Sequence, residues 1–378
     1  MKNGWTTVAL DDVCEFENGD RGENYPSRSV QTTEGVPFIN AGHLTDDGID
    51  PQSLNFIPRE RFDLLGNGKI RRGDILFCLR GSLGKFASVG TLSEGAIASS
   101  LVIVRPNESV LNEYILAYFG SDLCSEMISR YRNGAAQPNL SAGSLRKFLL
   151  PLPPLAEQRR IVGILDEAFE GLATAKANAQ QNLQNARALF ESHLQAVFTQ
   201  RGHGWVEKNL GDLCQIKTGK KDVNEGNPDG KYPFFTCAAA HTFSDDYSFD
   251  TEALLVAGNG NVGQVSYYSG KFEAYQRTYV LSDLKGVTAK YLFRVLDKRL
   301  RATVSKQKLG NTMPYIKIGM LTDFVVPVPP PKEQALVAEH LDAFAEETQR
   351  LESLYQRKLA ALDELKKSLL HRAFSGEL

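Results

Sequence analysis

Two glycine-rich segments of the chain have residues that could bind phosphate. The segment LRGSLGK at 79–85 contains a Gly-Lys pair, and AGNGNVGQ at 257–264 has two glycines separated by four residues. A nucleotide-binding P-loop requires a further glycine five residues before its Gly-Lys pair and Ser or Thr directly after the lysine. The first segment lacks both, and the second has Gln264 in place of the lysine. We therefore expect no nucleotide binding and no cofactor.

The remaining residue types that support catalysis are scattered along the chain. The six histidines form no H-E-x-x-H motif, and the five cysteines form no C-x-x-C pair, so neither a metal site nor a disulfide framework is indicated. No N-P-P-[FY] motif for an amino-group methyltransferase pocket is present. We expect reduced, buried cysteines, no metal and no catalytic residue.

The glycine-rich segments are better suited to hydrogen bonding with nucleic-acid bases. Arginine can pair bidentately with guanine, and asparagine or glutamine with adenine. Glycine in a tight turn also lets the backbone approach a groove. The candidate residues are Arg80, Ser82 and Lys85 in the first segment and Asn259, Asn261 and Gln264 in the second. The alternative is that both segments are ordinary hairpin turns that face solvent.

A second pair of polar clusters lies further along each half of the chain. Lysine and arginine there could bind phosphates with salt-dependent affinity, while an amide could reach a base. The members are Arg130, Arg132, Asn133 and Gln137 in the first half and Lys306, Gln307, Lys308 and Asn311 in the second. A solvated helix end is the alternative. Lys217, Lys220 and Lys221 form a weaker third candidate, whose alternative is ordinary surface charge.

An internal repeat organises the chain. Residues 134–166 align without gaps with residues 310–342, and 12 of the 33 positions are identical, far above chance. Upstream, GWTTVALDDVCEFENG at 4–19 matches GWVEKNLGDLCQIKTG at 204–219. Between these anchors the match is weaker, with DILFCLRGSLGKFASV opposite EALLVAGNGNVGQVSY. We expect two similar units rather than one large domain.

The divergent parts of the repeat have the pattern of short strands joined by turns. They are rich in Gly, Asn, Asp and aromatic or β-branched residues in short runs, which predicts an α+β, mainly β globule in each half. We expect short helices over 111–131 and 289–306. The expected globules cover residues 1–154 and 201–330, with long helices over 155–200 and 331–378.

Each globule is followed by a long helical segment. Proline-rich PLPP at 151–154 and PVPPP at 327–331 precede runs without proline that are dominated by Ala, Leu, Glu, Gln, Lys and Arg. About 40 residues would make a helix of roughly 60 Å. Apolar residues recur every three to four positions, from Ile161 and Leu165 to Phe190, as in a coiled coil. Small residues in one helix correspond to large ones in the other, so the sequence predicts an antiparallel pair.

The overall composition excludes several classes of protein. The chain has 378 residues, 42% of them hydrophobic and 23% charged, and no apolar run approaches the roughly 18 residues of a membrane span. The first residues lack an apolar signal-peptide core, so a cytoplasmic location is expected. The net charge of −2 gives no general basic signal for nucleic acid, so any DNA-binding surface must be local or completed by a partner.

These features together resemble the specificity subunit of type I restriction-modification systems. The resemblance covers essentially the whole chain and is carried by PLPPLAEQRRIVGILD, PVPPPKEQALVAEHLD and the C-terminal SLLHRAFSGEL. It implies a non-catalytic subunit that reads a split DNA target, one half per recognition domain. It also implies two DNA adenine methyltransferase subunits as partners and, optionally, two motor-nuclease subunits.

The repeat predicts what such a target looks like. Two units separated by a rigid spacer match half-sites about one helical turn, roughly 34 Å, apart. Because the two units differ in length and loops, the target should be bipartite and asymmetric. An adaptor whose repeats bind protein instead of DNA is the alternative function, and an enzyme is the third.

Overall fold

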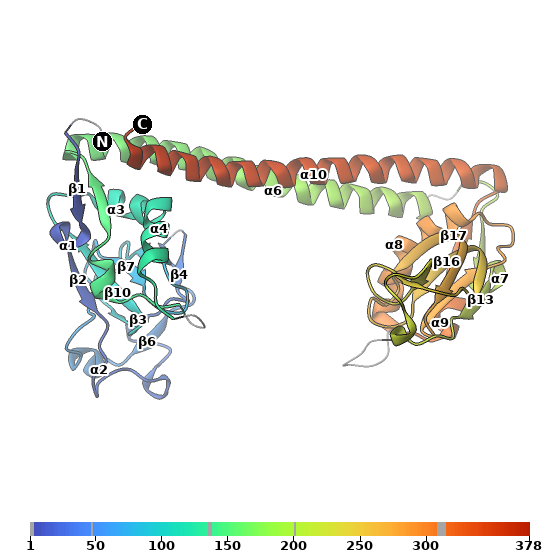
Figure 1. The fold of residues 1–378 in the computed structure, drawn as a ribbon, viewed down its shortest axis with the longest axis horizontal. Helices are drawn as coiled ribbons and strands as arrows, with labels where there is room; N and C mark the ends of the chain where they lie inside the picture. Colours follow the sequence, from blue (N-terminus) through green and yellow to red (C-terminus); the bar gives the residue numbers. More distant parts are fainter. Residues whose placement is uncertain (1–3, 47, 135–137, 200–201, 308–314) are drawn as a thin grey trace. The chain divides into compact units, whose positions relative to one another are not determined.

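The computed structural model of the chain describes residues 4–46, 48–134, 138–199, 202–307 and 315–378. They form two compact units, and each combines one β-rich globule with part of both long helices (Figure 1). Unit 1 comprises Met1–Gln180 and Gln356–Leu378, and unit 2 comprises Gln181–Tyr355. The predicted fold class, two mainly β globules with two long helices, is confirmed.

Unit 1 is built on a four-stranded sheet with the order β2-β10-β7-β8. Its strands are β2 (Cys14–Asn18), β10 (Leu101–Pro106), β7 (Ile75–Cys78) and β8 (Phe86–Ser88). A second sheet joins β6 (Asn55–Ile57), β3 (Val36–Ile39) and β9 (Ala96–Ile97), and β4 (Leu44–Thr45) pairs with β5 (Gly48–Ile49). The strand β7 is an unbroken apolar run because Phe77 packs toward the helices on one face and Leu76 toward Ile39 on the other.

Unit 1 also contains several short helices. They are α1 (Leu10–Val13), α2 (Arg59–Asp63), α3 (Asn112–Phe119), α4 (Asp122–Tyr131), α5 (Ala142–Leu145) and a 3₁₀ turn at Arg28–Val30. Of these, α3 and α4 pack on the first sheet and α2 on the second. The single helix expected over 111–131 is therefore wrong in one respect, since the chain breaks at Gly120 and Ser121. The Ser121 hydroxyl accepts a hydrogen bond from the Cys124 amide, and this N-cap starts a new helix.

Unit 2 has one six-stranded sheet with the order β13-β18-β16-β17-β14-β15. Its strands are β13 (Gln215–Thr218), β18 (Thr278–Ser282), β16 (Phe249–Ala257), β17 (Val265–Ala274), β14 (Tyr232–Phe235) and β15 (Thr242–Ser244). Its helices are α7 (Leu210–Leu213), α8 (Ala289–Gln307) and α9 (Ile318–Thr322), with a 3₁₀ turn at Val223–Glu225. The long β16-β17 hairpin lets Phe234 of β14 pair with Glu273 of β17, whereas in unit 1 Phe38 of β3 pairs with Ala96 of the separate strand β9.

A two-stranded ribbon ends each globule next to its long helix. In unit 1, β1 (Thr6–Ala9) pairs with β11 (Leu149–Leu152), and in unit 2, β12 (Val206–Asn209) pairs with β19 (Val325–Val328). Both second strands contain the first proline of the proline-rich motifs, which is tolerated because a two-stranded ribbon has free edges.

The two predicted long helices are α6 (Leu155–Thr199) and α10 (Pro331–Ser375). Within unit 1, Ile161 and Leu165 of α6 share a core with Phe374 of α10, and Lys176 Nζ lies 2.9 Å from Asp363 Oδ1. Within unit 2, other parts of the same helices meet. Phe190 stacks on Phe344 with ring centroids 5.9 Å apart, and Arg187 pairs with Glu352 at 3.1 Å. The predicted apolar seam and antiparallel pairing are confirmed inside each unit.

The glutamine of the first E-Q motif joins three parts of unit 1. The Gln158 side chain is fully buried. Its Oε1 accepts a hydrogen bond of 2.9 Å from the amide of Leu111, the residue before α3. Its Nε2 donates to the carbonyls of Ser109 at 3.1 Å and Pro153 at 2.9 Å. One side chain thus ties the start of α6 to the proline-rich motif and to the loop that leads into α3.

Gln334 makes the same three contacts in unit 2. Its Oε1 accepts from the Thr288 amide at 2.8 Å, and its Nε2 donates to the carbonyls of Gly286 at 2.9 Å and Pro329 at 3.1 Å. The side chain is 1% exposed. The glutamine of the E-Q pair therefore makes equivalent buried hydrogen bonds in both units. We call Gln158 and Gln334, with these contacts, the amide clamp.

A buried tyrosine supports the clamp in both units. Tyr114 of α3 donates its hydroxyl to the Pro151 carbonyl at 2.8 Å, and Tyr291 of α8 donates to the Pro327 carbonyl. Both rings are 0% exposed. The first proline of each motif keeps a free carbonyl that the ribbon does not use, and the tyrosine satisfies it.

We predict that Gln158→Ala destabilises the chain by about 2 to 4 kcal/mol, because it leaves the Leu111 amide and two carbonyls without partners in a buried place. The free energy of unfolding in urea measures the effect. Gln184→Ala removes an exposed glutamine from the same helix and should cost under about 0.5 kcal/mol. Equal losses for the two variants would contradict the clamp.

Candidate nucleic-acid interface

The two glycine-rich segments form equivalent hairpin tips. In unit 1 the Cys78 amide donates to the Lys85 carbonyl at 2.7 Å, and the Gly84 amide donates to the Cys78 carbonyl at 3.0 Å. In unit 2 the Ala257 amide donates to the Gln264 carbonyl and the Gly263 amide to the Ala257 carbonyl, both at 2.9 Å. Arg80 therefore corresponds to Asn259 and Ser82 to Asn261. The alignment of this stretch in the sequence is wrong by one residue.

Glycine is required at two equivalent positions of each tip. Gly81 and Gly84 have φ of 78° and 84°, and Gly260 and Gly263 have 59° and 77°, in the left-handed region that favours glycine. A Cβ atom at Gly84 would also lie 2.8 Å from the Ile128 side chain of α4. Each tip is thus held in one conformation, and in unit 1 it packs on the helix that carries the second candidate cluster.

The unit 1 tip is bonded to the second cluster through the backbone. Arg80 forms a β-bridge with Asn139, and the Leu140 amide donates to the Leu79 carbonyl at 2.9 Å. Asn133 and Asn139 exchange two backbone hydrogen bonds of 2.8 and 2.9 Å. Arg80 and Asn133, predicted separately from the sequence, therefore belong to one surface.

The same connection exists in unit 2. Asn259 forms a β-bridge with Tyr315, and the Ile316 amide donates to the Gly258 carbonyl at 2.9 Å. Tyr315 corresponds to Asn139 in the repeat, and the offset of 176 residues is that of the proline-rich motifs. The frame around the tip is thus repeated even where the side chains differ.

A hollow of about 400 Å³ opens beside Arg80. Its walls combine amide, hydroxyl and guanidinium groups from three separate segments: Asn18, Arg21, Leu79, Arg80, Asn139, Leu140, Ser141, Ala142 and Gly143. Among these described lining residues there is no carboxylate, although the whole chain has a net charge of −2. The Arg21 guanidinium is fixed by a 3.2 Å hydrogen bond to the Ser99 carbonyl. Such a surface is polar and locally positive, which suits nucleic acid.

Of the residues that line this hollow, the sequence singled out Arg80 and missed the others, among them Asn18, Arg21 and Asn139. Asn18 ends β2, Arg21 lies just beyond it, and Asn139 directly precedes Leu140, so these three reach Arg80 through strand pairing and the bridge at Arg80. The one available signal was the repeat, because Arg21 corresponds to Lys221 of the third candidate cluster and Asn18 corresponds to Thr218, which lies next to Lys217 of that cluster.

Two of the candidate side chains contact the protein backbone. Lys85 Nζ donates to the Ala41 carbonyl at 3.3 Å, and Gln264 Nε2 donates to the Ala239 carbonyl at 3.2 Å. Lys221 Nζ binds the Ser244 hydroxyl at 3.0 Å and lies 3.4 Å from Asp246 Oδ2. In the described structure these side chains brace loops, and whether they also bind DNA stays a prediction.

The remaining candidates differ in how far the structure describes them. The exposed candidates are Ser82, Arg130, Arg132, Lys217 and Lys220. Of these, Lys217 lies in the strand β13. Gln137, Lys308 and Asn311 lie outside the described residues, and the side chains of Lys306 and Gln307 are likewise not described.

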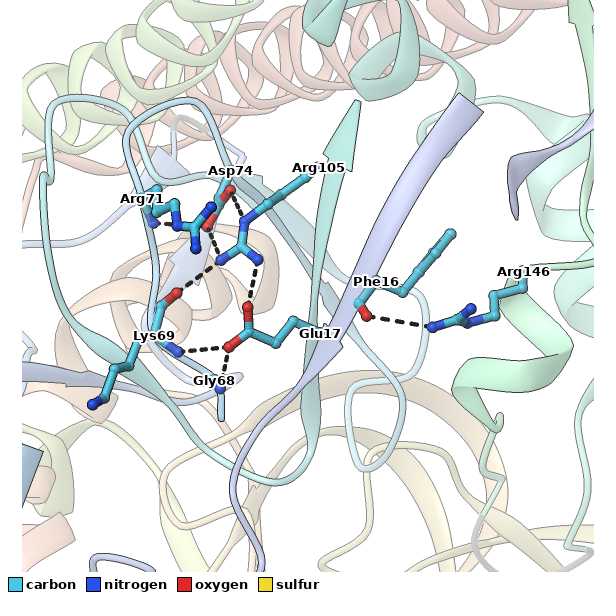
Figure 2. Close-up of polar contacts among 8 residues, drawn as sticks. All are labelled: Phe16, Glu17, Gly68, Lys69, Arg71, Asp74, Arg105 and Arg146. Carbon is cyan, nitrogen blue, oxygen red and sulfur yellow. Dashed lines mark hydrogen bonds and ion pairs between the residues drawn. The ribbon is translucent and has the colours of Figure 1, made fainter. Parts of the chain in front are cut away.

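A partly buried ion-pair network joins β2 to β10 and to Asp74, which directly precedes β7 (Figure 2). Arg105 of β10 donates to Glu17 of β2 and, at 2.9 Å, to Asp74 Oδ1. Glu17 also accepts hydrogen bonds from the amides of Gly68 at 2.7 Å and Lys69 at 3.2 Å. Because Asn18 follows Glu17 directly, this network fixes the strand that brings Asn18 to the hollow.

The two carboxylates of the network respond differently to burial. Burial alone would raise the pKa of Glu17, but hydrogen bonds from Arg105 and the Gly68 and Lys69 amides outweigh it, so that pKa lies below its ordinary value. Burial of the more enclosed Asp74 prevails over its hydrogen bonds and raises its pKa. Glu17 therefore stabilises the fold above its ordinary pKa and loses that contribution as pH falls.

Other kinds of chemistry find no support in the described part of the chain. No group of three or more His, Cys, Asp or Glu there could hold a metal ion. All five cysteines are buried and free, and burial raises the pKa of Cys14 and Cys214 to about 12, which disfavours reactive thiolates. Of the described helices, none has the length and apolar character needed to cross a bilayer.

The chain belongs to the family described as the type I restriction modification DNA specificity domain, which matches residues 2–184 and 202–359. The family is defined by DNA specificity, a recognition role rather than a catalytic one. The two matched segments cover both globules, in agreement with the repeat found in the sequence.

Several specificity subunits are similar to this chain. The type I restriction enzyme EcoDI specificity subunit of Escherichia coli is 37% identical over 174 residues, which are 46% of this chain and 38% of that protein. The StySPI specificity subunit of Salmonella potsdam is 22% identical over 434 residues and covers 100% of this chain and 90% of that protein. The first alignment thus spans well under half of its relative, and the second nearly all.

Solved structures share the fold. A chain described under "Structural basis underlying complex assembly and conformational transition of the type I R-M system" aligns with a TM-score of 0.85 at 21% identity, covering 100% of this chain and 99% of that one. The HsdS subunit from Thermoanaerobacter tengcongensis aligns with a TM-score of 0.65 at 20% identity, covering 100% and 98%. At these identities the likeness shows the fold alone.

We predict that Glu17→Gln lowers the free energy of unfolding by about 1 to 2 kcal/mol near pH 7, because Arg105 loses one charged partner. The difference from the unsubstituted chain should shrink as pH falls through the ordinary glutamate pKa of about 4.3 and then the lower folded value. Urea unfolding at several pH values measures this. Glu15→Gln, at an exposed position of the same strand, is the control, and a pH-independent difference for Glu17→Gln would contradict the argument.

Proposed function

We propose that this chain is the reader and scaffold of a type I restriction-modification complex, and that each unit reads one half of a bipartite, asymmetric DNA target. One observation carries the proposal. The same backbone frame occurs in both units, and it presents Arg80 in one and Asn259 in the other at equivalent positions. A shared frame with different side chains is what reading two unlike half-sites requires.

The charge distribution supports a local DNA surface rather than a general one. The hollow beside Arg80 contains two arginines and no carboxylate among its described lining residues, while the chain as a whole carries −2. Phosphate contacts dominate the affinity of most DNA-binding proteins. We therefore propose that partner subunits supply much of the affinity by enclosing the duplex, and that this chain supplies sequence specificity.

The proposed partners are DNA adenine methyltransferase subunits, two of them because the chain is a twofold repeat. Motor-nuclease subunits would join if the system also cleaves DNA. In this proposal, as in the family's defined role, catalysis belongs to the partners. We propose that the chain acts in the cytoplasm, where such a complex would meet DNA.

The proposed function predicts a methylation pattern that depends on this chain. Co-expression with a partner DNA adenine methyltransferase subunit, in a host free of other methylation, should give modified adenines in a two-part, asymmetric motif with an unspecified gap. Single-molecule sequencing maps them. Replacing residues 201–330 with the corresponding region of another specificity subunit should change one half of the motif and leave the other half intact.

The control is the same complex with residues 201–330 replaced by their own sequence through the same cloning route, which should return the original motif. A stable, active methyltransferase complex without a motif that depends on this chain would contradict the proposal and favour an adaptor that binds only protein.

A further inference from the structure

The two hairpin tips differ most where they could best distinguish bases. The register of the backbone hydrogen bonds makes Arg80 of unit 1 equivalent to Asn259 of unit 2. Each residue directly precedes a glycine with positive φ. Each forms the isolated β-bridge that joins its tip to the start of α5 or α9. The backbone of both residues is therefore fixed, and only the side chains differ.

In unit 1 the side chain at this position is a guanidinium, and no acid is among the described residues that line the hollow beside it. Arg80 is exposed, and no described residue forms an ion pair with it. Its neighbours in the hollow include Arg21, Asn18 and Asn139, so a ligand with acceptors would be favoured. Guanine presents two acceptors, O6 and N7, in the major groove, and the fork of arginine matches both.

In unit 2 the same position carries an amide, Asn259. Asn259 can donate to N7 and accept from N6 of adenine. Ile318, at the start of α9, takes the place in the repeat of Ala142, which lines the hollow with Arg80. The Ile318 side chain is 47% exposed. An exposed branched aliphatic side chain suits the methyl group of thymine, the base paired with adenine.

Neighbouring polar side chains on the tips are less free to read bases. Lys85 and Gln264 occupy equivalent positions, and both donate to carbonyls of the loops that follow β3 and β14. These contacts tie each tip to a neighbouring loop of its own unit. Arg80 and Asn259 have no comparable side-chain hydrogen bond in the described structure.

We propose that Arg80 reads a guanine in one half of the DNA target and that Asn259 reads an adenine in the other. The inference rests on the proposed function and goes further, since it names the position in each unit that selects a base and the base that it selects.

Exchanging the two side chains tests the inference. Arg80→Asn, Asn259→Arg and the double variant are each co-expressed with the methyltransferase, and the modified adenines are mapped. Arg80→Asn should change one guanine of one half-motif to adenine or leave it unspecified, with discrimination reduced about tenfold or more. Asn259→Arg should act on one adenine of the other half-motif, and the double variant should show both changes.

Matched controls separate base reading from charge and from folding. Arg72→Asn and Asn224→Arg make the same substitutions at exposed positions outside the tips and should leave the motif unchanged. Arg80→Lys keeps the positive charge but not the guanidinium fork. It should retain methylation with a weakened preference for guanine, because lysine can still donate to O6 and N7 but lacks the fixed geometry of the fork. Thermal unfolding and co-purification with the methyltransferase confirm that each variant is folded.

The outcomes distinguish this inference from the function on which it rests. An original motif that persists in Arg80→Asn and Asn259→Arg would overturn the base assignment and leave the proposed function standing. No motif for the unsubstituted complex would overturn both.

Discussion

The amide clamp at Gln158 and Gln334 is the interaction on which the rest of each unit depends. A buried glutamine with three hydrogen bonds connects the first turn of a long helix, the carbonyl of a proline and the entry to α3 or α8. Proline supplies no amide hydrogen for a sheet, so the carbonyls of the proline-rich motifs need hydrogen-bond donors from elsewhere. The clamp and the tyrosines Tyr114 and Tyr291 provide them.

Packed helices connect the clamp to the hairpin tips. The helix positioned by Gln158 is followed by α4, which packs against Gly84 of the unit 1 tip. In unit 2, α8 begins at the clamp itself, and its Val304 lies against Gly263. In both units, therefore, a helix that starts near or follows the clamp packs against the hairpin tip. This allows the outer strands to differ, with separate sheets in unit 1 and one six-stranded sheet in unit 2, without moving Arg80 or Asn259 within their units.

Features encoded by local pattern could be predicted from the sequence. Absence of proline and a regular apolar seam predicted α6 and α10, and 12 identities in 33 positions revealed the repeat. The register of the tips could not be read, because only the glycine pairs Gly81 and Gly84 and Gly260 and Gly263 fix it, and a slip of one residue still aligns apolar strands. The break in the helix over 111–131 depended on one capping serine, Ser121.

The candidate site was only partly readable for a related reason. Arg80 was recognised because a glycine-rich turn marks it, but Asn18, Arg21 and Asn139 join it from segments distant in sequence through strand pairing. Sequence also could not show that Lys85 and Gln264 donate to backbone carbonyls, since the side-chain type is the same whether it faces DNA or a loop.

The most direct test of the account is a structure of the chain with its methyltransferase partners on duplex DNA that contains the mapped target. The account predicts that the tips at Arg80 and Asn259 enter the major groove, one at each half-site, with the guanidinium and the amide within hydrogen-bonding distance of base edges. A complex in which both tips face solvent, or contact only the methyltransferase, would contradict it.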